Sequence, residues 1–92
     1  MNYEGINLRN ATLIDVREPL ELENDGKIAN GINIPLGTIA SKIDFIKTLK
    51  SPIVLYCRTG NRSGQALAYL ENQGVENIYN GGSWQEVAHK LG

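Results

Sequence analysis

The 92-residue sequence contains a single cysteine and a single histidine. One cysteine cannot form a disulfide within the chain, and a cysteine-rich metal site is excluded for the same reason. We therefore expect no metal and no other cofactor. A Cys–His hydrolase would have to use His89, which lies near the C-terminus and is more simply explained as a solvated helix residue.

The sequence also lacks an excess of charge of either sign and any long apolar run. Nine basic residues stand against ten acidic ones, for a formal net charge of −1. This balance gives no support to nucleic-acid binding. No apolar run approaches the ~20 residues that a membrane-spanning helix needs, and residues 1–10 do not resemble a signal peptide. We expect a cytoplasmic protein without a membrane partner; a periplasmic location would apply only if a leader had been removed.

What the sequence does contain is an alternation of short β-type runs with helical runs. We expect strands at residues 12–16, 32–34, 53–56 and 77–79, and helices at 19–24, 38–49, 63–73 and 84–92. Gly81-Gly82 is expected to turn the chain, and Ser83 with Glu86 fits a capping box. The pattern predicts one domain, 1–92, of α/β class. It should be a small three-layer domain with a mainly parallel central sheet of four or five strands flanked by helices.

The most informative segment is the loop 57–63, which follows the apolar strand 53–56. Open parallel sheets bind ligands at the carboxyl ends of their strands, where Cys57 stands. Gly60 and Asn61 tolerate left-handed backbone, so the loop can turn its N–H groups inward and form an anion-binding nest. A helix begins after the loop, and Arg58 and Arg62 add two cations.

These features all favour the thiolate of Cys57 over the thiol, so we predict a pKa below the ~8.5 of a free cysteine. A thiolate that is already formed needs no general base. The same loop can hold the anionic outer sulfur of a persulfide, and the two arginines can dock a small dianion such as thiosulfate. The loop is therefore compatible with sulfur transfer at Cys57.

Four motifs, spread over nearly the whole chain, resemble the rhodanese homology domain family. They are residues 13–18 (LIDVRE), 26–36 (GKIANGINIPL), 57–63 (CRTGNRS) and Gly81-Gly82 with Trp84. Residues 63–66 and 80–82 are similar to single-domain sulfurtransferases of the phage-shock protein E type. One departure is Lys27, where the family usually has histidine; we interpret that position as structural.

The resemblance implies a sulfurtransferase of the thiosulfate (rhodanese) type. Sulfur would pass from a small sulfur-containing anion to cyanide, a small thiol or dithiol, or a thioredoxin-like protein through a Cys57 persulfide. The persulfide-binding loop would comprise Arg58, Thr59, Gly60, Asn61, Arg62 and Ser63. Asp15 and Arg17 would give structural support through a salt bridge, Ser63 would be the first helical residue or the cap, and Trp84 would pack in the core.

Two alternatives stay open at this point. A cysteine-dependent phosphatase or arsenate reductase also uses a cysteine and an arginine in an anion-binding loop, but with five residues between them; four separate Cys57 from Arg62. The shorter loop suits one sulfur atom better than a tetrahedral oxyanion. The other alternative is a non-catalytic rhodanese-like module for binding or sulfur relay, although such modules usually lack the cysteine.

Overall fold

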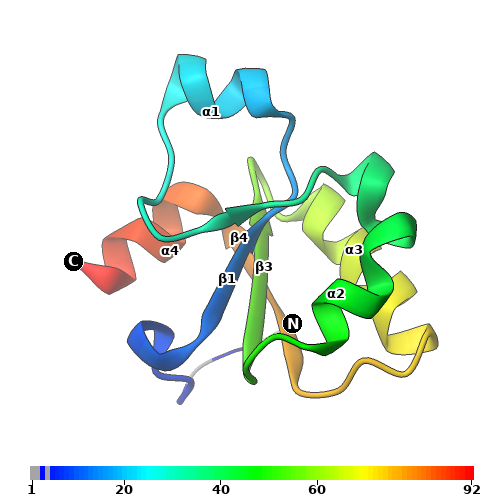
Figure 1. The fold of residues 1–92 in the computed structure, drawn as a ribbon. Helices are drawn as coiled ribbons and strands as arrows, with labels where there is room; N and C mark the ends of the chain where they lie inside the picture. Colours follow the sequence, from blue (N-terminus) through cyan, green and yellow to red (C-terminus); the bar gives the residue numbers. More distant parts are fainter. Residues whose placement is uncertain (1–2, 4) are drawn as a thin grey trace.

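Strands and helices alternate along the chain in the computed structural model, which describes residue 3 and residues 5–92 (Figure 1). The strands are β1 (Thr12–Asp15), β2 (Ile32–Asn33), β3 (Ile53–Cys57) and β4 (Ile78–Ser83). The α-helices are α1 (Pro19–Asp25), α2 (Ile43–Lys47), α3 (Asn61–Asn72) and α4 (Trp84–Leu91), and two 3-10 helices are η1 (Leu8–Asn10) and η2 (Leu36–Lys42). None of the helices in this described part of the chain is long and apolar enough to cross a membrane.

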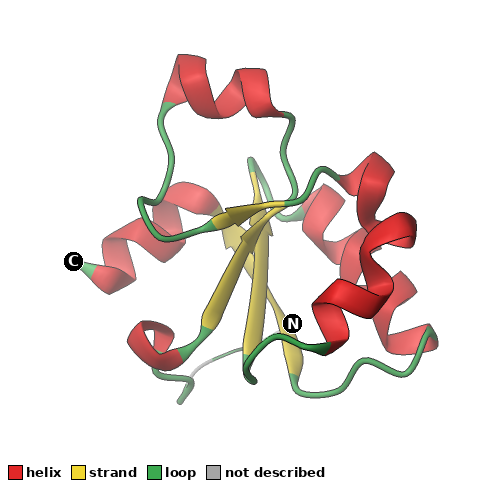
Figure 2. Ribbon diagram, viewed as in Figure 1, coloured by secondary structure: helices red, strands yellow, loops and turns green. Residues whose placement is uncertain are grey.

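The four strands form one sheet in the order β2-β1-β3-β4, and every described pairing is parallel. Helices cover both faces of this sheet (Figure 2). The predicted α/β architecture with a parallel central sheet is thus confirmed, with four strands. Every residue of the inner strand β3 is buried, as expected for an apolar strand that is covered on both faces.

Side chains along β3 alternate between two core clusters. Ile53, Leu55 and Cys57 face the larger cluster, which α2, α3 and η2 complete. Val54 and Tyr56 face the smaller cluster, with contributions from η1 and α4. Because side chains alternate with a period of two in a strand, Cys57 is directed toward the face on which α3 packs.

Two expected helices begin at other residues in the structure. The segment predicted as a helix at 38–49 is a 3-10 helix followed by the short helix α2. The hydroxyls of Thr38 and Ser41 donate to carbonyls three residues earlier, a local bond that suits a tighter turn. Helix α3 begins at Asn61 after Gly60, so Ser63 lies inside the first turn and the prediction that it is the first helical residue or cap was wrong.

The strand β4 is longer than expected and includes Gly81-Gly82, which does not turn the chain. Leu55 pairs with Asn80 and Tyr56 with Gly82, so one additional residue, Gly81, forms a bulge in β4. A side chain on Gly81 would lie 2.8 Å from both Val54 Cγ1 and Val87 Cγ2. Glycine is therefore required there by packing. The capping box of Ser83 and Glu86 that opens α4 is confirmed.

Candidate functional site

Cys57 ends β3 and lies beneath the loop that leads into α3. Its side chain has 0% exposure. The N–H of Gly60 donates to Cys57 Sγ at 3.0 Å, and the Ser63 hydroxyl lies 3.5 Å from the same sulfur. The sulfur is thus surrounded by donors from the loop and from the first turn of the following helix.

These donors decide the ionisation of Cys57. Burial raises the pKa of the thiol, but the Ser63 hydroxyl and the N–H groups of Ser63, Thr59 and Gly60 favour the thiolate more strongly, and the resulting pKa is below the usual value. A buried sulfur with a lowered pKa is a nucleophile that needs no general base. His89, the one histidine of the sequence, is exposed on α4.

The loop owes its shape to Gly60. Its backbone is left-handed, with φ of 98°, and a Cβ atom there would lie 3.2 Å from Gly82 Cα. Glycine, which has no Cβ, therefore accommodates both the left-handed backbone and the close approach of β4. Thr59 and Asn61, the two neighbours of Gly60 that were predicted as loop residues, expose their side chains.

Asn80 holds the loop from the neighbouring strand, a role that the sequence analysis did not assign to it. Its Nδ2 donates to the Gly60 carbonyl at 3.0 Å, and its Oδ1 accepts from the Ser63 hydroxyl at 2.7 Å and from Gly82 N–H at 3.0 Å. The bulge in β4 follows directly after Asn80. Its position directly before Gly81-Gly82 was the available signal, but only the strand pairing shows what it contacts.

The two arginines of the loop have different surroundings. Arg58 is exposed. Arg62 forms a two-pronged ion pair with Glu21 of α1, with Nη1 2.7 Å from Oε2 and Nη2 2.8 Å from Oε1. Hydrogen bonding with Arg62 lowers the pKa of Glu21 to about 2, and the same bonds raise the pKa of Arg62. Sequence analysis assigned no role to Glu21.

Asp15 and Arg17 form a buried ion pair at the end of β1, with Arg17 Nη2 2.7 Å from Asp15 Oδ2 and exposures of 1% and 2%. Arg17 also donates to the carbonyl of Gly26, just after α1, and its guanidinium lies 4.8 Å from the centre of the Trp84 ring. Trp84 itself is half-buried against the smaller core cluster. The pair therefore connects the two ends of the α1 segment, and neither residue has a described hydrogen bond to Cys57.

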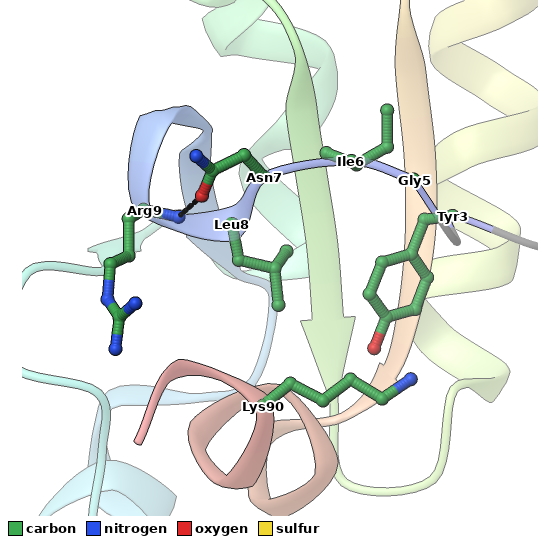
Figure 3. Close-up of a pocket in the computed structure, with 7 residues that line it drawn as sticks. All are labelled: Tyr3, Gly5, Ile6, Asn7, Leu8, Arg9 and Lys90. Atoms are coloured by element: carbon green, nitrogen blue, oxygen red, sulfur yellow. Dashed lines mark hydrogen bonds between the residues drawn. The ribbon is translucent and has the colours of Figure 1, made fainter.

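A separate hollow lies between the N-terminal segment and α4 (Figure 3). It is lined by Tyr3, Gly5, Ile6, Asn7, Leu8, Arg9 and Lys90. None of these residues belongs to the loop 57–63, and they include neither a nucleophilic sulfur nor a carboxylate. Within residues 3 and 5–92, no group of three or more His, Cys, Asp or Glu side chains is placed to hold a metal ion. The loop around Cys57 is therefore the candidate site.

Known proteins resemble the chain over most of its length. The family described as Rhodanese-like domain matches residues 2–90. The uncharacterized protein YqhL of Bacillus subtilis is 46% identical over 72 residues, which cover 78% of this chain and 56% of that protein. The thiosulfate sulfurtransferase GlpE of Pseudomonas syringae is 35% identical over 78 residues, covering 83% of this chain and 70% of GlpE. A rhodanese with anions from E. coli superposes with a TM-score of 0.73 at 28% identity, covering 85% of this chain and 92% of that one.

Proposed function

The chain belongs to the family of rhodanese-like domains, and from this membership we propose that it is a sulfurtransferase in which Cys57 carries the transferred sulfur as a persulfide. The observation that supports this most directly is the set of donors around Cys57 Sγ, with Gly60 N–H at 3.0 Å. These donors stabilise an anionic sulfur, which is the form of cysteine before loading and of the persulfide after it.

The proposed reaction has two steps. The Cys57 thiolate attacks the outer sulfur of a donor such as thiosulfate, an S–S bond forms, and the donor's own S–S bond breaks with its electron pair leaving on sulfite. A nucleophilic acceptor such as cyanide or a thiol then attacks the outer sulfur of the persulfide. A bond forms between the acceptor and this outer sulfur, and the S–S bond of the persulfide breaks. Its electron pair stays on Cys57 Sγ, which is again a thiolate.

The complete burial of Cys57 adds one requirement to this proposal. A donor reaches the sulfur only if the loop 57–63 opens slightly, because no area of the side chain contacts solvent. The loop is held by the hydrogen bonds of Asn80 with Ser63 and with the Gly60 carbonyl, and these are the bonds that such an opening would strain. We propose a cytoplasmic reaction with cyanide, a small thiol or a thioredoxin-like protein as acceptor.

The test is to incubate the protein with thiosulfate and to record intact mass spectra of the wild type and of Cys57→Ser. We expect the wild type to gain the mass of one sulfur atom and to lose it on addition of cyanide, with thiocyanate released. The serine variant should gain nothing. A wild-type protein that stays unloaded by thiosulfate and by other sulfane donors, while its thiol still reacts with iodoacetamide, would contradict the proposal.

A further inference from the structure

The ion pair between Arg62 and Glu21 removes one of the two positive charges of the loop. Both terminal nitrogens of the guanidinium are within 2.8 Å of a carboxylate oxygen, which is the bidentate geometry that binds most firmly. Glu21 also accepts from the N–H of Glu18 at 2.9 Å. The carboxylate is therefore fixed in place by two elements, α1 and α3.

Of the charged side chains of the loop and of the ion pairs beside it, Arg58 is the one cation without an anionic partner; beyond the loop, Lys90 and Glu86, of opposite charge, line the hollow next to Thr59 and Gly60. Arg17 is neutralised by Asp15 in the buried pair, and Arg62 by Glu21. Arg58 takes part in no ion pair among the described residues. Against this one charge stands the thiolate of Cys57, which raises the pKa of Arg62 by its proximity. The helix α1, which carries Glu21, adds the exposed carboxylates Glu23 and Asp25.

Resting on the sulfur transfer proposed above, we infer that Glu21 is a specificity-determining residue: by neutralising Arg62 it makes the loop select sulfane donors with one negative charge over dianions such as thiosulfate. An approaching dianion meets a neutral Arg62–Glu21 pair, and only Arg58 remains to offset the thiolate. A monoanionic donor, such as an alkanethiosulfonate anion or an organic persulfide anion, loses half as much attraction when the charge of Arg62 is neutralised. Glu21 touches Arg62 and acts on the donor through charge.

Two donors of nearly equal size and different charge make this testable. Thiosulfate carries two negative charges, and methanethiosulfonate, in which a methyl group replaces one oxygen, carries one. In each case Cys57 takes the outer sulfur, the donor's S–S bond breaks, and the electron pair leaves on sulfite or on methanesulfinate. The total charge is conserved in both reactions.

The experiment measures kcat/KM for both donors with wild type, Glu21→Gln and Glu23→Gln, with cyanide as acceptor. Glutamine retains the capping role at position 21 but releases the charge of Arg62. We expect the ratio of kcat/KM for thiosulfate to that for methanethiosulfonate to rise roughly fivefold in Glu21→Gln at low ionic strength. The gain should shrink in 1 M salt. Glu23→Gln loses the same charge from an exposed position on the same helix and should change the ratio by less than about twofold.

The outcomes separate this inference from the proposed function. If Glu21→Gln changes both donors by the same factor, or if Glu23→Gln shifts the ratio equally, the charge role of Glu21 is overturned while sulfur transfer stands. If neither donor loads the wild-type protein, sulfur transfer itself fails. Melting curves of the three proteins test whether both variants are folded. If they are, a rise in the thiosulfate-to-methanethiosulfonate ratio of kcat/KM in Glu21→Gln alone supports the inference.

Discussion

The hydroxyl of Ser63 has one proton and two neighbouring acceptors. It lies 2.7 Å from Asn80 Oδ1 and 3.5 Å from Cys57 Sγ, so in the resting loop the proton belongs to the shorter bond. Asn80 Oδ1 also accepts a hydrogen bond from the N–H of Gly82, and this bond does not depend on Ser63. The hydroxyl can therefore rotate toward a thiolate or a persulfide without leaving Asn80 unsatisfied.

This arrangement gives a prediction for Ser63→Ala. The Ser63 hydroxyl is the strongest of the groups that lower the pKa of Cys57 against the effect of burial, so removing it should raise that pKa. The rate of alkylation by iodoacetamide, measured against pH, should show its inflection at higher pH than in the wild type. Ser41→Ala, at an exposed position on η2, should leave the inflection unchanged. An unaltered inflection in Ser63→Ala would show that the N–H groups of the loop suffice.

Among the helices of the described part of the chain, α1 is the one without a buried residue. None of its residues is buried, and Leu20 is 64% exposed. In Figure 1 the helix lies above the carboxyl end of the sheet, joined to the rest by two extended segments. Arg17 binds the carbonyl just after the helix, and Arg62 binds Glu21 within it. One ion pair and one hydrogen bond from a guanidinium therefore hold α1 over the site.

The low pKa of Glu21 makes part of the stability dependent on pH. Its folded value is about 2, below the ordinary 4.5, so the stabilisation is complete above pH 4.5 and is lost as the pH falls toward 2. Because both side chains are partly exposed, we expect about 1 kcal/mol, or several degrees in Tm, between wild type and Glu21→Gln at neutral pH. That gap should narrow below pH 4.5 and close below about pH 2, whereas Glu23→Gln should melt with the wild type throughout. Thermal melts at a series of pH values measure both curves, and a gap that stays constant down to pH 2 would be evidence against the pair.

At the scale of the whole molecule, the sheet separates two core clusters that share its strands. Leu70 of α3 belongs to the larger cluster, and Trp84 at the start of α4 packs against the smaller one. Adjacent residues of β3 contribute to both clusters, so neither face can lose its packing without disturbing the strand that serves the other. We expect the two faces to unfold together, as the predicted single domain requires.

Leu70→Ala tests this coupling. The side chain has 0% exposure, and its truncation should cost about 2–5 kcal/mol. Urea unfolding followed by Trp84 fluorescence, which reports on the opposite face, should shift as far as unfolding followed by circular dichroism. Leu20→Ala removes the same atoms from an exposed helix and should shift neither curve appreciably. Two separate transitions in Leu70→Ala would mean that the faces unfold independently.

The sequence by itself determined the parallel α/β fold and the place of Cys57 in it. The buried strand, the glycine in the loop and the helix that follows are local features, and local features are what hydrophobic period and glycine position encode. The start of α3 and the length of β4 were missed, because Gly60 and Gly81 have roles that depend on contacts with other strands.

Only the tertiary structure decided what surrounds the sulfur. Asn80 and Glu21 are 23 and 36 residues from Cys57 along the chain. Asn80 stands out only by its position before Gly81-Gly82, and Glu21 stands out neither by type nor by spacing. The pairing of β4 with β3 brings Asn80 to the loop, and α1 brings Glu21 to Arg62. The sequence shows that the loop contains two arginines. Whether either arginine is neutralised depends on which side chains the fold places beside it.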